Sequence, residues 1–418
     1  MAQKLYSLLI ALVNFLLPVI ALFSSKMKKF SSGRKEVLAQ LRAKIKETDR
    51  VIWFHAASLG EYEQGVPVME EVRKLYPTHK ILLSFFSPSG YTIKKDTPLA
   101  DVVVYLPLDT ERAAKEFIKL AHPEIALFIK YEFWPNYLNA LKKSGAKTVL
   151  ISGVFRSNQP FFKWYGKWML KSFEVFDHFF VQNETSYELA KSLGFNNVTV
   201  SGDTRFDRVS AQLKQNNKVD FIEEFVDSKP CLVCGSTWPE DEDLLLDFLN
   251  NYVANSAIKV IIAPHQINEE KITSFVEKLK VKVVRFSKKE GENLALFPVF
   301  ILDTVGFLGR VYQYADVAYI GGAAGTTGLH NILEPATFGL PIITGTNIIK
   351  FPEAVRLRQL AGLYAVNSAE EANDLLVKFF EKKDFREKAG IISGHFVQNN
   401  TGATRIITKY LQNHTVTA

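Results

Sequence analysis

The chain opens with an apolar run from Leu5 to Phe23 that is interrupted by Ser7, Asn14 and Pro18. A helix of this length just crosses a hydrocarbon layer of about 30 Å. Basic residues follow the run, and by the positive-inside rule they keep the body of the protein cytoplasmic. They are Lys26, Lys28, Lys29, Arg34 and Lys35. We therefore predict an anchor over residues 1–30 in the inner (cytoplasmic) membrane. The short span and Pro18 leave a helix lying in the membrane interface as the alternative.

From about residue 50, short apolar runs alternate with amphipathic stretches, which indicates βαβ units around a parallel sheet. A helix is predicted from about Glu61 to Leu75. The strands predicted in the first half are Val51–Phe54, Ile81–Phe85, Val102–Tyr105, Ile125–Ile129, Thr148–Ile151, His178–Val181 and Val198–Val200.

Polarity rises over Ser210 to Lys229, where no strand is predicted, and we place an interdomain linker there. The alternation then restarts. The strands predicted in the second half are Cys231–Cys234, Lys259–Ala263, Lys282–Val284, Phe300–Leu302, Val317–Ile320 and Pro341–Ile343. Two α/β halves predict two Rossmann-like domains that face each other across a cleft, with ligands at the carboxyl ends of strands. The predicted domains are 31–215 and 216–418, with a last helix that can pack back on the first domain.

Composition adds a constraint on partners. The 418 residues carry a formal net charge of +7, which suits nucleic acid, an anionic membrane or a phosphorylated substrate. The basic residues are scattered and match no nucleic-acid recognition pattern. A membrane or a phosphate partner is therefore favoured over nucleic acid.

The two cysteines, Cys231 and Cys234, form a C-x-x-C motif inside an apolar strand. No further zinc ligands are evident nearby, and on a strand the two thiols would point to opposite faces. We interpret both as buried structural residues. Their low number suits a reducing compartment.

The strongest chemical signal is the glycine-rich segment Gly321–Pro335, which follows a predicted strand. Glycines let a ligand approach the backbone closely, and unpaired amides suit a phosphate. Glu334 precedes a proline that is well placed to open a helix, and its carboxylate could hold both hydroxyls of a ribose. The segment is neither a Walker loop nor a dinucleotide fingerprint, and a flexible turn with a helix cap is the structural alternative.

A second loop, Gly235–Glu242, also follows a strand, and its small hydroxyl residues could hold phosphate oxygens. Asp241-Glu242-Asp243 resembles a D-x-D metal motif but is better explained as the acidic first turn of a helix. His55, His265 and His330 show no metal-ligand spacing. We predict neither a metal nor another cofactor.

The third signal is Trp53–Glu61, in which a strand delivers a loop and then a carboxylate at a helix start. Ser58 and Glu61 have capping-box spacing, and from spacing alone this structural role is the more probable one. The functional alternative makes Glu61 a general base that activates an acceptor hydroxyl.

Two further loops follow strands of the first half. Glu132 could orient a sugar hydroxyl and Arg156 could meet an anionic group, although either could equally form a local salt bridge. The aromatic and lysine-rich stretch Phe161–Met169 suits a membrane interface or an acyl-chain groove. A core-facing helix is the equal alternative.

Taken together, these motifs resemble the 3-deoxy-D-manno-oct-2-ulosonic acid (Kdo) transferases of lipopolysaccharide synthesis, over nearly the whole chain. The segments that carry the resemblance, in family order, are Trp53–Glu61, Trp134–Asn136, Gly202–Asp207, Gly235–Thr237 and His330–Pro335.

The resemblance implies a GT-B fold with an acceptor domain followed by a donor domain. It implies CMP-Kdo as donor, a phosphorylated lipid A precursor as acceptor, and metal-independent inversion. Glu61 matches the family's catalytic base. The expected donor contacts are Gly235, Ser236, Thr237, Pro264, His265, Gly306, Gly325, Thr326, Thr327, Gly328, His330, Asn331 and Glu334. The expected acceptor or phosphate contacts are Ser58, Gly60, Glu132, Arg156 and Arg205.

The chain departs from the family pattern at three positions. Pro264 stands where the family has Arg, Phe307 where it has Glu, and Lys130 where it has the first Glu of its Glu-Thr-Glu-Leu-Trp segment. Three alternatives therefore stay open: a GT-B transferase that uses a UDP-sugar, a membrane-tethered binding protein without turnover, and an NAD-dependent oxidoreductase. The missing early fingerprint disfavours the last.

Overall fold

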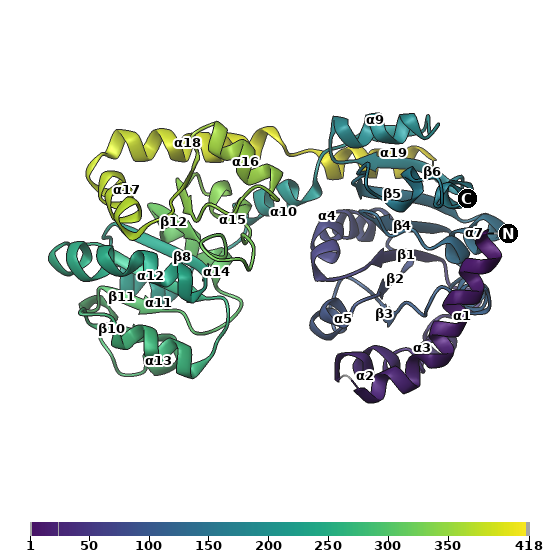
Figure 1. Cartoon of the computed structure of the whole chain (residues 1–418), viewed down its shortest axis with the longest axis horizontal. Helices are drawn as coiled ribbons and strands as arrows, with labels where there is room; N and C mark the ends of the chain where they lie inside the picture. Colours follow the sequence, from purple (N-terminus) through teal and green to yellow (C-terminus); the bar gives the residue numbers. More distant parts are fainter. Residues whose placement is uncertain (1, 24, 415–418) are drawn as a thin grey trace. The chain divides into compact units, whose positions relative to one another are not determined.

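The computed structural model describes residues 2–23 and 25–414, and the chain divides into two compact units (Figure 1). Unit 1 comprises Met1–Arg208 and Thr401–Ala418, and unit 2 comprises Val209–Asn400. The outermost ends of the predicted anchor and of the predicted second domain, residues 1 and 415–418, lie outside the described residues. The boundary between the units falls inside helix α10 (Thr204–Gln212).

Unit 1 is built on a sheet of seven parallel strands in the order β3-β2-β1-β4-β5-β6-β7. The strands are β1 (Val51–Ala56), β2 (Lys80–Phe85), β3 (Val102–Tyr105), β4 (Ile125–Ile129), β5 (Lys147–Gly153), β6 (Phe176–Val181) and β7 (Val198–Val200). The adjacent strands β1 and β4 are buried at every position, which explains their continuous apolar sequences. The strand order reverses between them, and this topological switch point is where ligands bind in such sheets.

The helices of unit 1 alternate with its strands along the chain and lie on both sides of the sheet (Figure 1). They are α1 (Ala2–Ile20), α2 (Ser25–Ser32), α3 (Val37–Lys44), α4 (Leu59–Leu75), α5 (Pro88–Lys94), α6 (Glu111–Ala121), α7 (Pro135–Ser144), α8 (Leu170–Phe173), α9 (Glu184–Ser192), α10 and α19 (Ala403–His414), with short 3₁₀ turns η1 (Ala21–Phe23), η2 (Pro160–Phe162) and η3 (Lys167–Met169). Neighbouring residues such as Trp53 and Phe54 enter different core clusters, because successive strand side chains point to opposite faces.

Unit 2 repeats this architecture with the strand order β10-β11-β9-β8-β12-β13-β14. The strands are β8 (Cys231–Thr237), β9 (Lys259–Pro264), β10 (Val283–Arg285), β11 (Val299–Ile301), β12 (Val317–Ile320), β13 (Ile342–Thr344) and β14 (Leu363–Ala365). All the predicted strands of both halves are present. The edge strand β14, of which only Leu363 is buried, is missing from the prediction. Here the switch point lies between β8 and β12, which pair in parallel.

The helices of unit 2 include α11 (Asp220–Val226), which lies in the polar stretch between the two predicted sheets. The others are α12 (Pro239–Asp247), α13 (Glu269–Glu277), α14 (Leu308–Val311), α15 (Leu333–Thr337), α16 (Pro352–Gln359), α17 (Ala369–Glu381) and α18 (Lys383–Asn399), with the short turns η4 (Phe248–Tyr252), η5 (Val253–Asn255), η6 (Phe286–Lys288), η7 (Leu294–Leu296) and η8 (Tyr312–Tyr314).

The chain returns to unit 1 in its last helix, α19. Ile407 and Leu411 of α19 join the hydrophobic cluster that contains Phe54. The carboxylate of Asp207 in α10 accepts hydrogen bonds from the amides of Gly402 and Thr404 at the start of α19, at 2.6 and 2.8 Å. This carboxylate therefore satisfies amides that would otherwise be unpaired at a helix start.

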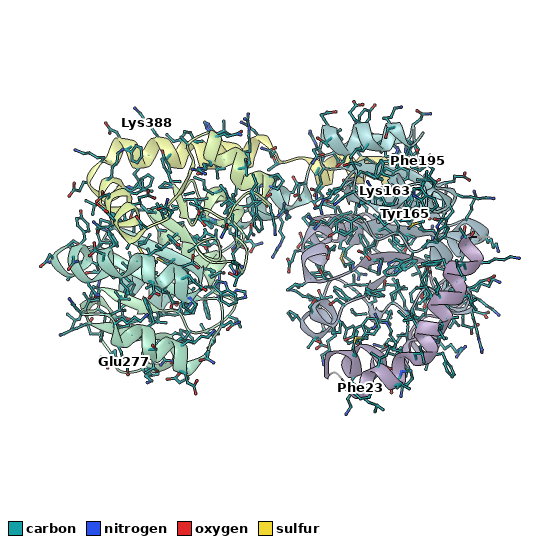
Figure 2. All side chains as sticks on the ribbon, in the orientation of Figure 1. Phe23, Lys163, Tyr165, Phe195, Glu277 and Lys388 are labelled. Carbon is teal, nitrogen blue, oxygen red and sulfur yellow. The ribbon has the colours of Figure 1, made fainter. Side chains whose placement is uncertain are left out.

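Helix α1 is long and apolar enough to cross a membrane, by length and composition. Polar contacts join it to the rest of unit 1: the Tyr6 hydroxyl donates to Asp109 at 2.8 Å, and the Ser7 hydroxyl donates to Asn136 at 3.1 Å. Most of its large apolar side chains are exposed, as is Phe23 at the end of η1 (Figure 2). The helix thus presents an apolar surface that no described part of the chain covers.

The aromatic stretch Phe161–Met169 is not one helix but two short 3₁₀ turns, η2 and η3. The alternative of a core-facing helix is therefore wrong. Phe161 is buried, whereas Trp164 and Tyr165 are 86% and 56% exposed (Figure 2). Gly166 explains part of the geometry, because a Cβ there would lie 2.1 Å from the carbonyl oxygen of Pro160.

Candidate functional site

The carboxyl end of β1 in unit 1 delivers Glu61 into a buried position. Ser58 precedes α4 in an extended conformation, and its hydroxyl donates directly to the Glu61 carboxylate. The predicted capping box is therefore wrong, because the Ser58 side chain caps no backbone amide. Glu61 is 7% exposed, and Gly60 beside it is exposed. A buried carboxylate needs partners to remain charged.

Lys130, at the carboxyl end of β4, supplies the cation for this carboxylate. Its Nζ lies 3.5 Å from Glu61 Oε1. The backbone of Lys130 has a φ of 74°, a conformation that a lysine rarely adopts. Because β1 and β4 flank the switch point, Glu61 and Lys130 meet where ligands enter such sheets. Lys130 is not among the site residues predicted from the sequence, although it was noted there as a departure from the family pattern.

Arg156 and Lys130 flank the ring of Tyr131. The Arg156 guanidinium carbon lies 5.8 Å from the ring centre and Lys130 Nζ lies 5.1 Å from it. No carboxylate of the described residues lies within 4 Å of the exposed Arg156, so the salt-bridge alternative is not formed. Arg205 is different, since its guanidinium pairs with Asp203 at 2.7 Å. Arg156 is thus the cation open to an anionic ligand.

Glu132 lies beside a hydrogen-bonded histidine. The Trp134 indole N–H donates to His55 Nε2 at 3.1 Å, and His55 Nδ1 contacts the Ser84 hydroxyl at 2.8 Å. Glu132 Oε2 lies 3.8 Å from the same Nε2. Because an indole can only donate, Nε2 carries a lone pair and cannot form an ion pair with Glu132. The Glu132 side chain, which is 12% exposed, is therefore held neither by His55 nor by an ion pair with another of the described residues.

In unit 2, the end of β8 is tightly constrained. Ser236 has a φ of 55°, and the pairing of β8 with β9 is irregular between Gly235 and Thr237. A Cβ on Gly235 would lie 2.0 Å from the Tyr312 hydroxyl, so only glycine fits. The Thr237 side chain is buried and its hydroxyl donates to Glu242 at 2.9 Å. Ser236, which is half-buried, is the available hydroxyl of this loop.

The glycine-rich loop follows β12 at the same switch point. It folds back on itself, because the Gly328 amide donates to Gly322 and the His330 amide donates to Gly321. The Asp241 carboxylate fastens the loop to β8 by accepting from the amides of Gly322 and Trp238 at 2.8 and 2.9 Å. Asp241 lies in the acidic first turn of α12, as predicted.

The outer part of this loop offers free donors. The backbone N–H groups of Gly325, Thr326, Thr327 and Asn331 donate to no acceptor in the part of the chain that the structure describes. Gly328 has a φ of 99°. Unpaired loop amides of this kind suit a phosphate group. Within residues 2–23 and 25–414, no cluster of three metal-binding side chains occurs.

Three rings pack together beside the loop. The Trp238 and His265 ring centres lie 4.7 Å apart, and those of His265 and His330 lie 4.3 Å apart. The Trp238 indole N–H donates to His330 Nε2 at 3.1 Å. Burial lowers the pKa of His265, and burial together with His265 lowers the pKa of His330 to about 4. Pro264, where the family has Arg, precedes this cluster at the end of β9.

The remaining predicted donor residues lie around α14 and α15. Gly306 is exposed with a φ of 91°, and Phe307 packs against Phe221 at 5.3 Å between ring centres. The family's Glu at this position is thus replaced by part of an aromatic cluster. Glu334 stands in the first turn of α15, where its carboxylate accepts from the Asn331 side chain at 3.1 Å.

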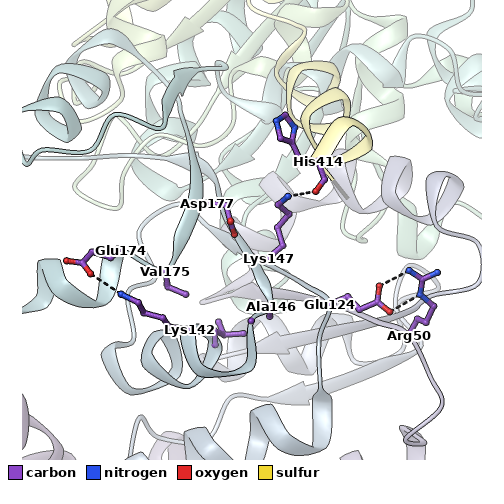
Figure 3. A pocket seen from close by; sticks show the side chains of 11 residues that line it. Arg50, Glu124, Lys142, Ala146, Lys147, Glu174, Val175, Asp177 and His414 are labelled. Carbon is purple, nitrogen blue, oxygen red and sulfur yellow. Dashed lines mark hydrogen bonds and ion pairs between the residues drawn. The ribbon is translucent and has the colours of Figure 1, made fainter. Parts of the chain in front are cut away.

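The two cysteines and a surface pocket do not have the features of a ligand-binding or catalytic site. Cys231 and Cys234 are free and buried on β8, which confirms their structural interpretation, and burial raises the pKa of both thiols. A pocket of about 750 Å³ lies at the amino ends of β1, β4 and β5 (Figure 3). Its charged groups are paired: Arg50 with Glu124 at 2.8 Å, Lys142 with Glu174 at 2.9 Å, and Lys147 with the His414 carbonyl.

Two Rossmann-like units whose polar loops gather at the switch points define a protein of the GT-B type, which confirms the predicted fold class. The fold is shared with the UDP-GlcNAc 2-epimerase of Neisseria meningitidis bound to UDP-GlcNAc, with a TM-score of 0.62 and 14% sequence identity, over 87% of this chain and 100% of that one.

The resemblance to Kdo transferases is also confirmed. Residues 32–208 match the family described as 3-deoxy-D-manno-octulosonic-acid transferase (kdotransferase). The 3-deoxy-D-manno-octulosonic acid transferase of Chlamydophila psittaci is 27% identical over 77% of this chain and 76% of its own length. That of Haemophilus influenzae is 25% identical over 86% of both chains. These homologues support a glycosyltransferase.

Proposed function

We propose that this protein transfers Kdo from CMP-Kdo to a phosphorylated lipid A precursor in lipopolysaccharide biosynthesis, with inversion at the anomeric carbon. The observation that carries the proposal is the buried Glu61 carboxylate, held between Ser58 and Lys130 at the switch point of unit 1. It occupies the position of the base in the family pattern. The relatives that are named as Kdo transferases support the choice of donor.

In the proposed reaction, Glu61 removes a proton from an acceptor hydroxyl while the oxygen attacks the anomeric carbon of Kdo. The bond from that carbon to the CMP phosphate breaks, and CMP leaves with the bonding electron pair. Lys130 balances the charge of Glu61 before the proton arrives. Arg156, which is exposed and without a carboxylate partner among the described residues, binds a phosphate of the acceptor.

Unit 2 holds the donor in this proposal. The unpaired amides of Gly325, Thr326, Thr327 and Asn331, together with the Ser236 hydroxyl, bind the phosphate of CMP and stabilise it as it leaves. Glu334 binds the ribose. Helix α1 anchors the protein to the cytoplasmic face of the inner membrane, and its exposed apolar side chains support this placement.

The direct test is transfer by the full-length protein in detergent. Incubation with CMP-Kdo and a lipid A precursor should add the mass of one or more Kdo residues to the lipid, and NMR of the product should show the inverted anomer. Parallel reactions with UDP-N-acetylglucosamine test a UDP-sugar donor. Transfer from the UDP-sugar alone would contradict the proposal, and binding without any turnover would favour a tethered binding protein.

A further inference from the structure

The contact between Trp238 and His330 fixes where the imidazole carries its proton. An indole nitrogen has a hydrogen and no lone pair, so it can only donate. The Trp238 Nε1 to His330 Nε2 distance of 3.1 Å is that of a hydrogen bond. Nε2 must therefore be the unprotonated nitrogen. In a neutral imidazole this leaves the hydrogen on Nδ1.

The surroundings of His330 hold the ring in one orientation. Its Cδ2 edge faces the backbone of Gly322, where a Cβ would approach it to 3.1 Å. Its face packs on His265. The backbone amides of Trp238 and Gly322 both donate to the Asp241 carboxylate. One side chain therefore holds both the residue that donates to His330 and the residue that the Cδ2 edge of His330 faces.

The other edge of the imidazole carries Nδ1. No described residue provides an acceptor for His330 Nδ1, although the side chain is only half-exposed. His330 belongs to the loop in which the amides of Gly325, Thr326, Thr327 and Asn331 also lack acceptors among the described residues. Burial and the neighbouring His265 keep the pKa of His330 at about 4, so the imidazole is neutral near pH 7. The edge therefore presents an N–H group and neither a lone pair nor a cation.

We propose that Trp238 is a positioning residue that locks His330 as the Nδ1–H tautomer, so that unit 2 presents a fixed N–H donor to a phosphate oxygen of the bound nucleotide. The proposal rests on the proposed function, because that function supplies CMP as the ligand. It adds a role for Trp238, which contacts His330 and not the phosphate. Without the indole N–H, the imidazole can exchange tautomers and present a lone pair that repels the phosphate oxygen.

The lock can be seen by NMR of the full-length protein labelled with ¹⁵N-histidine, using long-range ¹H–¹⁵N correlations between pH 6 and 8. The His330 signals are identified by their loss in His330→Gln. The wild-type protein should show a protonated Nδ1 and an unprotonated Nε2. Trp238→Phe retains a ring for packing but has no N–H, and it should show a mixture of tautomers. Trp164→Phe, at an exposed position, should leave the pattern of the wild type.

The consequence for binding is measured by calorimetry with CMP and with cytidine. Trp238→Phe should weaken CMP binding about 5- to 10-fold, the value of one hydrogen bond, and leave cytidine binding unchanged. A wild-type His330 protonated on Nε2 would overturn the lock even if the variant did not fold. A tautomer change without a loss of CMP affinity, or with an equal loss for cytidine, would overturn the phosphate contact. Failure of the wild type to bind CMP would instead contradict the proposed function, while the tautomer spectrum would still test the lock.

Discussion

The ammonium group of Lys130 lies 3.5 Å from the carboxylate of Glu61, although 69 positions separate the two residues in the sequence. The pairing of β1 with β4 brings them together, because each residue follows the carboxyl end of one of these strands. Ser58 supplies a second contact to the same carboxylate. An unpartnered charge at this burial would cost several kcal/mol. The two contacts thus explain how a carboxylate can be kept ready to accept a proton.

If Glu61 is the general base, Glu61→Gln should lower the rate of transfer by about 100-fold or more. The amide has nearly the same shape and can still accept from Ser58, so the fold should be retained. Initial rates with CMP-Kdo and a lipid A precursor, together with circular dichroism, measure both effects. Glu70→Gln, at an exposed position on the same helix, is the matched control and should keep full activity. Near-normal turnover of a folded Glu61→Gln protein would exclude Glu61 as the base.

Replacing Ser236 with glycine should maintain or raise the free energy of unfolding but lower the affinity for CMP. Its φ of 55° strains any residue except glycine, so Ser236→Gly should be as stable as the wild type or up to about 1 kcal/mol more stable. Ser236→Ala keeps the strain and should be less stable than the glycine variant by about 1 kcal/mol. Both lose the hydroxyl and should bind CMP about 5-fold more weakly. Urea unfolding and calorimetry measure these differences, and normal CMP affinity in both variants would remove Ser236 from the donor site.

Gly235 and Tyr312 should be energetically coupled. Gly235→Ala places a methyl group 2.0 Å from the position of the Tyr312 hydroxyl, which should cost about 1–3 kcal/mol of unfolding free energy. In the double variant with Tyr312→Phe, the nearest ring atom is the carbon at 3.2 Å, so much of the loss should be recovered. Chemical unfolding of the wild type and the three variants gives the coupling energy, expected at about 1–2 kcal/mol. Additive losses would show that the backbone moves instead.

The lowered pKa of His330 predicts a pH dependence of stability. In the unfolded chain a histidine takes up a proton near pH 6.5, whereas folded His330 does so only near pH 4. Between these pH values the unfolded state binds more protons than the folded state, so the free energy of unfolding falls as the pH is lowered from 6.5 to 4. The stabilising contribution of the neutral His330 is fully present above pH 6.5. His330→Gln should show a shallower dependence over this window in urea unfolding at a series of pH values. Parallel curves for the two proteins would show that His330 titrates normally.

Much of the fold could be predicted from the sequence because its strands are buried on both faces and therefore appear as continuous apolar runs. All thirteen predicted strands are present, and Asp241 lies in the first turn of a helix, as its acidic neighbours suggested. The edge strand β14 was missed; it is not buried on both faces, since only Leu363 of its three residues is buried. For the stretch Phe161–Met169, the alternative of a core-facing helix failed. Its many aromatic residues are compatible with a helix, but Gly166 and the turns around it divide the segment.

The site was harder to predict, because its contacts depend on which strands become neighbours. Ser58 and Glu61 have capping-box spacing, yet the Ser58 hydroxyl donates to the Glu61 carboxylate, which also contacts Lys130 at the end of the neighbouring strand β4. The bond between Trp238 and His330 spans 92 positions and has no local signature. Thr237 looked like a free hydroxyl beside Ser236, but its buried side chain donates to Glu242. Residue types were therefore visible in the sequence, whereas their partners were not.

The cap on α19 provides the last test, because it concerns how the end of the chain is held on unit 1. Asp207→Ala removes acceptors for the amides of Gly402 and Thr404 and for the Thr404 hydroxyl. Loss of a helix cap should cost about 1–2 kcal/mol. Since Ile407 and Leu411 belong to the core of unit 1, the effect should appear in urea unfolding and as faster proteolysis near residue 400. Asp220→Ala, at a position with a side chain 89% exposed, should change the free energy by less than about 0.5 kcal/mol. Equal effects of the two substitutions would mean that packing alone holds α19 in place and that the carboxylate of Asp207 adds nothing.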